Sequence, residues 1–406
     1  MTQSPELAGG EGFTFEGDAA AYYLTALLAE GYAPGIDDRT VVRVSVQQRD
    51  FGEPLDDVIV DFEDAAKNPS RLSLQIKRSL TISKAETNSD FRDIIRDSWA
   101  TLTKPDFRIN IDRYGAAVGT VATAKERALK TLCDWARESL TTNHFAARFE
   151  AEGNASADTI MVKNDVVGLL NEAKGIPSTS EEVHRFLAHF VLIQFDLLRE
   201  GTTDPPDAIN RIRECLAPDD SSKAPLVWSR IVQLARASAG KAGQFDRARL
   251  LRSISLVARL RGGVSFSLDL DKLTELAESY ANFIPDDIGG TKLDRTSLLG
   301  ELDAKLTTAR VVQIRGLPGS GKSVLVRRAV QRSLERGPTL FLKAEQLEGT
   351  SWISYASSQG LSGAPLEQLL VEIGAAGTPM LFIDAIDRVE KKHQPIILDV
   401  IRAIVE

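Results

Sequence analysis

The stretch VVQIRGLPGSGKS, residues 311–323, decides the fold of the C-terminal part of this 406-residue chain. It fits the pattern G-x-x-x-x-G-K-[ST] of a P-loop, in which glycines let backbone N–H groups curl around a phosphate at the start of a helix. We therefore expect a strand over Val311–Ile314 and a helix over Val324–Leu334. The residues predicted to hold ATP and its Mg²⁺ are Gly316, Gly319, Gly321, Lys322 and Ser323.

A second acidic motif, LFIDAID at residues 381–387, follows the P-loop. The apolar run Met380–Ile383 predicts a buried parallel strand that delivers Asp384 and Asp387 to the C-terminal edge of a sheet. P-loop NTPases place their second metal contact at that edge. The alternative interpretation is a buried strand that ends in an ordinary polar turn.

The composition is that of an ordinary globular protein, with 43% hydrophobic and 26% charged residues and a net charge of −8. A chain with a net negative charge cannot bind nucleic acid through its overall charge. Any contact with nucleic acid must therefore be made by a local cluster of basic residues. Two cysteines without metal-ligand spacing indicate a reducing compartment. We find neither a signal peptide nor an unbroken apolar span, and we therefore expect a cytoplasmic protein without a membrane partner.

Charge is distributed unevenly along the chain. Residues 1–64 hold 14 acidic and 3 basic side chains, whereas residues 65–148 hold 9 acidic and 15 basic ones. A second basic block, Lys223–Arg261, holds nine Lys or Arg and the single acid Asp246. Two interpretations stay open for this block: it packs against the acidic N-terminal part, or it tracks a nucleic-acid backbone.

Hydrophobic periodicity predicts a multidomain α/β plus α protein. Residues 1–150 form an α/β module, residues 151–285 a helical connector, and residues 286–406 a partial P-loop NTPase domain. The connector contains a helix over 181–199 that is apolar around most of its circumference. In the N-terminal module we expect helices at Asp18–Glu30, Asp90–Leu102 and Thr123–Leu140, and strands at Thr40–Gln48, Asp57–Phe62, Arg71–Ile82 and Arg108–Ile111.

Chemistry-bearing residues gather on two of these strands. Side chains alternate along a strand, so Gln75 and Lys77 point to the same face. A hairpin between the two strands would place the Asp57 carboxylate beside that pair, although a one-residue slip would exchange it for Asp56. An acid close to a Q-x-K motif is an arrangement suited to metal-dependent cleavage of phosphodiester bonds. In this interpretation the metal is bound by Asp57, the Gln75 side-chain oxygen and the Ile76 carbonyl. Lys77 stabilises the negative charge that develops at phosphorus.

The N-terminal module resembles the PD-(D/E)XK nucleases of the Q-x-K variety, as found in type IV restriction enzymes and antiphage effectors. Its opening GFTFEGD, residues 12–18, is similar to those effectors, and the resemblance implies that Glu16 joins the metal site. Because Gln75 replaces an acid, the choice between Mg²⁺ and Mn²⁺ stays open.

The C-terminal motifs QIRGLPGSGKS and LFIDAID resemble the STAND ATPases, relatives of NACHT domains. This resemblance implies that Asp384 binds the Mg²⁺ water shell and that Asp387 takes the second acidic position; Arg388, where many members carry an acid, favours a slow switch. Only 19 residues follow Asp387, so we expect the chain to be the front part of a longer protein.

Together the motifs resemble the Avs type of antiphage STAND proteins. The resemblance implies an ATP-dependent homo-oligomer, triggered by a phage protein that a missing C-terminal region senses, whose nuclease cuts double-stranded DNA. A signalling scaffold that binds protein partners without cutting is the main alternative. A DNA-translocating motor is disfavoured because its helicase motifs are absent from the sequence.

Overall fold

The structure is a computed structural model that describes residues 5–150, 154–197, 203–238, 241–288, 290–292 and 294–405. The chain forms two compact units. The first, called here the N-terminal unit, comprises Met1–Glu214 and Ser222–Leu250, and the second, the C-terminal unit, comprises Cys215–Ser221 and Leu251–Glu406. Within the described ranges, no helix is long and apolar enough to cross a membrane.

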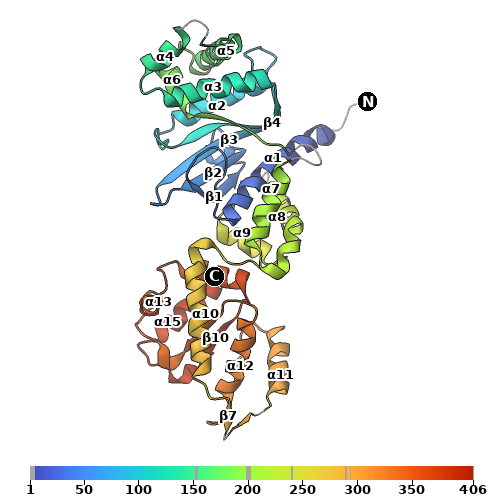
Figure 1. Ribbon diagram of the computed structural model, residues 1–406, viewed down its shortest axis with the longest axis vertical. Helices are drawn as coiled ribbons and strands as arrows, with labels where there is room; N and C mark the ends of the chain where they lie inside the picture. Colours follow the sequence, from blue (N-terminus) through green and yellow to red (C-terminus); the bar gives the residue numbers. More distant parts are fainter. Residues whose placement is uncertain are drawn as a thin grey trace. The chain divides into compact units, whose positions relative to one another are not determined.

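The N-terminal unit is built on one six-stranded mixed sheet with the order β5-β4-β3-β2-β1-β6 (Figure 1). β1, β2 and β3 are antiparallel neighbours, β3, β4 and β5 are parallel ones, and β6 pairs antiparallel with β1. The strands are β1 (Thr40–Val46), β2 (Val58–Glu63), β3 (Pro69–Leu80), β4 (Arg113–Val121), β5 (Phe190–Gln194) and β6 (Gln244–Phe245).

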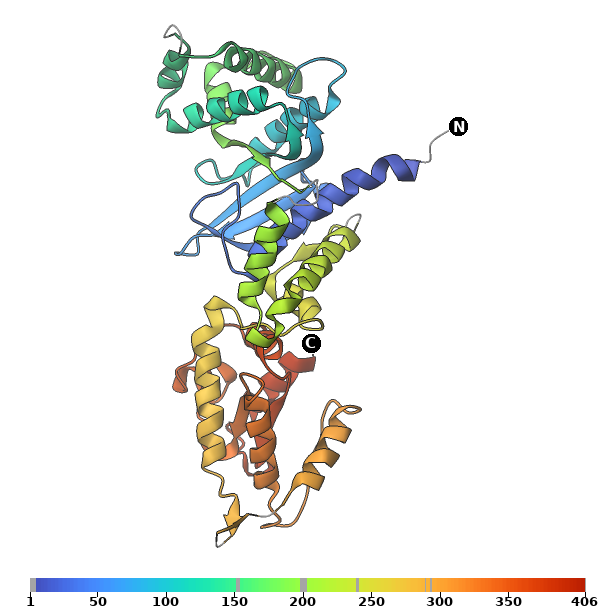
Figure 2. The same cartoon turned by 45° about the vertical axis from the view of Figure 1, so that its right-hand side comes forward.

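Helices cover both faces of this sheet (Figures 1 and 2). α1 packs against β1 and β3 on one face, with α7 and α8 on the same side. α2, α3, α5 and α6 enclose a large apolar core on the other face. The helices are α1 (Pro5–Leu28), α2 (Ser89–Leu102), α3 (Thr123–Glu138), α4 (Thr142–Glu150), α5 (Ala157–Lys174), α6 (Ser180–His189), α7 (Asp204–Cys215) and α8 (Ala224–Ser238); α9 (Arg247–Ile254) spans the unit boundary in the chain.

The C-terminal unit packs helices around a pair of parallel strands, β9 (Leu340–Lys343) and β10 (Leu381–Asp384). α10 contacts both β9 and α12, and α15 closes a second part of the core against α13 and α14. Its remaining elements are α10 (Ser267–Asn282), α11 (Thr296–Leu306), α12 (Lys322–Leu334), α13 (Trp352–Ser358), α14 (Leu366–Ala376), α15 (Gln394–Val405) and the short hairpin β7 (Asp287–Ile288) with β8 (Thr291–Lys292).

Four sequence-based expectations are wrong in their secondary structure. Residues 181–199 are not one helix: α6 ends at His189 and the chain continues as β5, a strand of the main sheet. Residues 311–314 form no strand, and 108–111 precede β4 rather than forming a strand themselves. The first helix starts at Pro5, well before Asp18.

The basic block contributes directly to the packing of the N-terminal unit. The guanidinium group of Arg247 donates a hydrogen bond to the Leu28 carbonyl and lies 3.7 Å from a Glu30 oxygen. Only 13% of the Arg247 side chain is exposed. Arg249 lies over the Phe245 ring and donates to the Gln244 carbonyl. These contacts favour the interpretation that this part of the block packs against acidic and backbone oxygens.

We therefore predict that Arg247→Glu destabilises the protein, because it places a second carboxylate beside Glu30 where a guanidinium stood. Removing one partner of such a mostly buried contact typically costs about 3 kcal/mol. Thermal unfolding measures the loss, and the exposed Arg252→Glu serves as the matched control. An unchanged melting temperature with weakened, less salt-dependent DNA binding would instead support the nucleic-acid interpretation.

Candidate functional site

The candidate site of the N-terminal unit is organised around the Asp57 carboxylate. Val58 pairs with Leu74 in the antiparallel β2–β3 ladder, so Asp57 lies next to the opposing Gln75. Asp57 Oδ2 accepts a hydrogen bond of 2.5 Å from Gln75 Nε2 and one of 2.7 Å from the Ile76 backbone N–H. One carboxylate oxygen therefore joins the start of β2 to the middle of β3.

The structure decides between Asp56 and Asp57. Asp56 points to a different set of partners, where its Oδ1 accepts hydrogen bonds of 3.1 and 2.9 Å from the Arg49 guanidinium. The same guanidinium group lies 3.4 Å from Asp97 on α2. Asp56 is thus engaged in an ion pair with Arg49, and Asp57 is the acid that faces Gln75.

Lys77 and Glu16 complete the cluster from two other directions. Lys77 Nζ forms an ion pair of 3.3 Å with Asp90 in the first turn of α2, and about one third of its side chain is exposed. Glu16 is carried by α1, where burial raises the pKa of its carboxyl group and the Lys77 charge and a hydrogen bond from Gln47 oppose that rise. The Glu16 charge in turn acts on Asp57, so all four predicted nuclease residues share one electrostatic site.

Both carboxyl groups of the site hold their protons more tightly than usual. Burial first, and then the neighbouring Glu16 charge, raise the pKa of Asp57 from 3.8 to about 7 against the opposing effects of the Ile76 N–H and Lys77. Burial also raises the pKa of Glu16. Two partly buried acids therefore repel each other with too little positive charge nearby, which is the environment that a divalent cation relieves.

The residues present fit a hard cation such as Mg²⁺ or Mn²⁺. Gln75 Oε1 is buried and has no hydrogen-bond partner, although its Nε2 is bonded to Asp57. An unpartnered buried carbonyl oxygen beside two carboxylates is an oxygen donor set of the kind that these cations prefer. Among the described residues no group of three or more His, Cys, Asp or Glu could hold a metal ion.

The P-loop residues of the C-terminal unit are also brought together. Lys322 Nζ donates to the carbonyls of Gly316 and Leu317 at 2.8 and 3.0 Å. Ser323 Oγ donates to Asp384 Oδ1 at 2.9 Å, which joins the start of α12 to the end of β10. Asp387 lies exposed in the following turn.

Glycine is required at two positions of this loop, because Gly319 and Gly321 have φ angles of 78° and 82°. Sequence reasoning missed Arg295, whose Nη2 donates to the Ser320 carbonyl at 3.1 Å. It also missed Asp90 as the partner of Lys77. Neither residue belongs to a local motif, so only the folded arrangement reveals them.

No family model and no curated protein matches this chain. Among solved structures, it is similar to the Cap4 SAVED/CARF-domain receptor of Moraxella osloensis, at 14% identity and a TM-score of 0.36 over 86% of this chain and 69% of that one. It is also similar to the Acinetobacter baumannii Cap4 SAVED/CARF-domain receptor with the cyclic trinucleotide 3'3'3'-cAAA, at 12% identity and a TM-score of 0.37 over 89% and 71%. The same receptor with 2'3'3'-cAAA matches at 11% identity and a TM-score of 0.36, over 89% and 68%.

These comparisons correct the family expected from the sequence. The matched structures are Cap4 receptors, so the assignment to the Avs-type STAND ATPases with a PD-(D/E)XK effector is wrong. At these TM-scores the likeness assigns no ligand and no activity to this chain. The closeness of Gln75 and Lys77 to Asp57, and of Ser323 to Asp384, is a feature of the structure itself and does not depend on that assignment. The roles of Glu16 and Asp387 were expected only from the resemblance, and Asp387 lies exposed.

We predict that Asp57→Asn stabilises the protein above neutral pH. A carboxyl group whose pKa is raised in the folded state favours folding when protonated, so its unfavourable effect grows as pH rises from about 4 to about 7. Asparagine carries no such charge. The melting temperature of the variant should exceed that of the wild type by several degrees at about pH 8, without added metal, and by little at about pH 4.

The exposed Asp50→Asn is the matched control, and it should show no such pH-dependent difference. If the Asp57→Asn difference were the same at both pH values, Asp57 would not be the strained acid that the site requires.

Proposed function

We propose that the N-terminal unit is a metal-dependent nuclease that hydrolyses phosphodiester bonds of double-stranded DNA. One observation carries the proposal: the buried Gln75 Oε1 lacks a partner beside the Asp57 carboxylate, whose pKa is raised to about 7. A purely structural cluster would give the Gln75 oxygen a hydrogen-bond donor and would give Asp57 an ion-pair partner, as Arg49 serves Asp56. Such an uncompensated set of oxygens suits a divalent cation.

The side chains divide the chemistry among them. Glu16, Asp57 and the Gln75 oxygen would hold the cation, which when bound supplies positive charge and acidifies a coordinated water. Lys77 stands on the same face of β3 as Gln75, and Asp90 holds its ammonium group in place. From there it offsets the negative charge that develops on the phosphate oxygens as water adds to phosphorus and the P–O bond to the leaving group breaks.

Nuclease activity can be tested by plasmid cleavage with Mg²⁺ or Mn²⁺. We predict that Lys77→Ala lowers the rate of cleavage at least about 100-fold, because one charged contact to the transition state is typically worth several kcal/mol. The melting temperature should change little. Lys67→Ala is the matched control, since Lys67 is an exposed lysine in the β2–β3 turn.

Asp57→Ala should abolish cleavage by loss of the metal ligand. Undiminished cutting by both Lys77→Ala and Asp57→Ala would refute the assignment. A well-folded wild-type protein that cuts no DNA with either metal would favour the scaffold alternative.

For the C-terminal unit we propose that the P-loop binds a nucleoside triphosphate with Mg²⁺. The contact between Ser323 and Asp384 supports this, because it brings together a hydroxyl and a carboxylate that in P-loop proteins share the metal. Lys322 now bonds to two loop carbonyls and would exchange them for phosphate oxygens. An antiphage role, a phage-protein trigger and ATP-dependent oligomerisation stay predictions.

Lys322→Ala should weaken the binding of a fluorescent ATP analogue at least about 10-fold, through loss of a charge-assisted phosphate contact. The control is Lys392→Ala, an exposed lysine of the same unit that pairs with Glu390. Equal affinities of Lys322→Ala and the wild type would show that the loop does not hold phosphate.

A further inference from the structure

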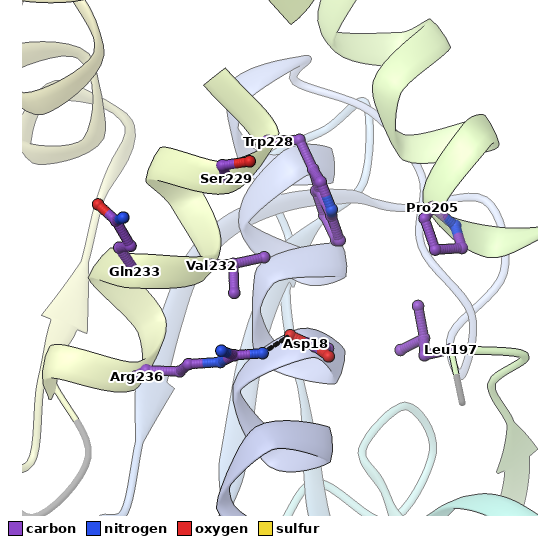
Figure 3. Close-up of a pocket in the computed structure, with 8 residues that line it drawn as sticks. All are labelled: Asp18, Leu197, Pro205, Trp228, Ser229, Val232, Gln233 and Arg236. Carbon is purple, nitrogen blue, oxygen red and sulfur yellow. Dashed lines mark hydrogen bonds and ion pairs between the residues drawn. The ribbon is translucent and has the colours of Figure 1, made fainter. Parts of the chain in front are cut away.

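A pocket of about 340 Å³ lies in the N-terminal unit, on the face of the sheet that carries α1. Its residues come from α1, α7, α8 and the segment after β5 (Figure 3). None of them belongs to the proposed nuclease site. The pocket is lined by Asp18, Leu197, Pro205, Trp228, Ser229, Val232, Gln233 and Arg236.

The upper part of this pocket is an apolar slot. Trp228 projects from α8 towards the side on which Pro205 lies, in the first turn of α7, and Val232 and Leu197 lie below them in the view of Figure 3. The indole ring of Trp228 offers a flat aromatic face, on which a planar ligand gains stacking energy. A bulky, rounded ligand would use this face less well.

The base of the pocket is polar and carries both signs of charge. Arg236 Nη2 donates to Asp18 Oδ1 at 2.8 Å, and the exposed fractions of the two side chains are 44% and 18%. The stem of Arg236 lies against the α1 backbone, since a Cβ on Gly17 would be 2.5 Å from its Cγ. A carboxylate has about four acceptor sites and a guanidinium has five N–H donors, so this pair presents an acceptor and donors side by side.

We propose that this pocket binds a nucleobase. A simple anion would be repelled by Asp18, a simple cation would be repelled by Arg236, and a hydrocarbon ring would desolvate the pair without hydrogen-bonding to it. A nucleobase has a flat aromatic face for Trp228 and an edge on which donors and acceptors are adjacent. Ser229 also lines the pocket, and its hydroxyl group points towards the side of Trp228, where a sugar hydroxyl group would meet it (Figure 3).

The test is isothermal titration calorimetry of the full chain with adenosine, guanosine, cytidine and uridine. Free nucleosides are used because they lack the phosphates that the P-loop would hold. We expect at least one nucleoside to bind saturably, and Trp228→Leu and Arg236→Met each to weaken that binding at least about 10-fold, as expected from the loss of stacking or of a charge-assisted hydrogen bond.

Two matched controls lie on the same helix, α8. Leu226→Ala removes an exposed apolar side chain outside the pocket, and Arg230→Met removes a guanidinium outside it, so neither should change the affinity. Absence of binding for all four nucleosides would overturn the proposal. So would binding that survives both pocket substitutions, or equally tight binding of indole, which stacks but lacks the adjacent donors and acceptors. These outcomes are independent of DNA cleavage, so failure of the nuclease proposal would not be mistaken for failure of this one.

Discussion

The Asp57 carboxylate is the group on which the N-terminal site depends. Its Oδ2 accepts hydrogen bonds from Gln75 and from the Ile76 backbone, so the position of β2 along β3 and the orientation of the Gln75 amide are set together. Gln75 Nε2 donates to Asp57, and the Gln75 oxygen is left without a partner. The arrangement is unfavourable for the ionised, metal-free protein, as the raised pKa of Asp57 shows. Strain of this kind is typical of functional sites, where stability is given up for binding.

The hairpin and its Q-x-K strand could be predicted from the sequence because period-2 alternation is a strong local signal. That alternation puts Gln75 and Lys77 on one face whatever the surroundings. The choice between Asp56 and Asp57 could not be predicted, since a one-residue slip exchanges them and only the pairing of Arg49 with Asp56 fixes the answer. The approach of Glu16 to this site depends on how α1 packs on the sheet, which no local pattern specifies.

The errors in secondary structure have physical causes too. A strand buried on both faces of a parallel sheet is apolar at nearly every position, so FVLIQ at residues 190–194 reads as the continuation of a buried helix. In α1 the glycines at 9, 10 and 12 have low helix propensity and suggest a later start, but the helix runs through them. Residues 311–314 are mostly apolar, which led to the expectation of a strand. In the structure, however, β9 pairs with β10 and Val311 is 84% exposed. Residues 311–314 therefore have no neighbouring strand to pair with, and they do not form a strand themselves.

The two proposed sites differ in how their ligand-binding groups are held without a ligand. In the C-terminal unit each key group has an intramolecular partner: Lys322 bonds to loop carbonyls, and Ser323 bonds to Asp384. A nucleotide must replace these bonds, so its net gain is only the difference between the new contacts and the old ones. In the N-terminal unit Lys77 also has a partner, Asp90, but Gln75 Oε1 has none and the two carboxyl groups repel each other. A cation there forms contacts without breaking equivalent ones and removes a repulsion. In the N-terminal site the unpartnered oxygen and the repulsion between the carboxyl groups already destabilise the folded chain before any cation binds. Less free energy is therefore needed there to prepare the site for its ligand than in the P-loop.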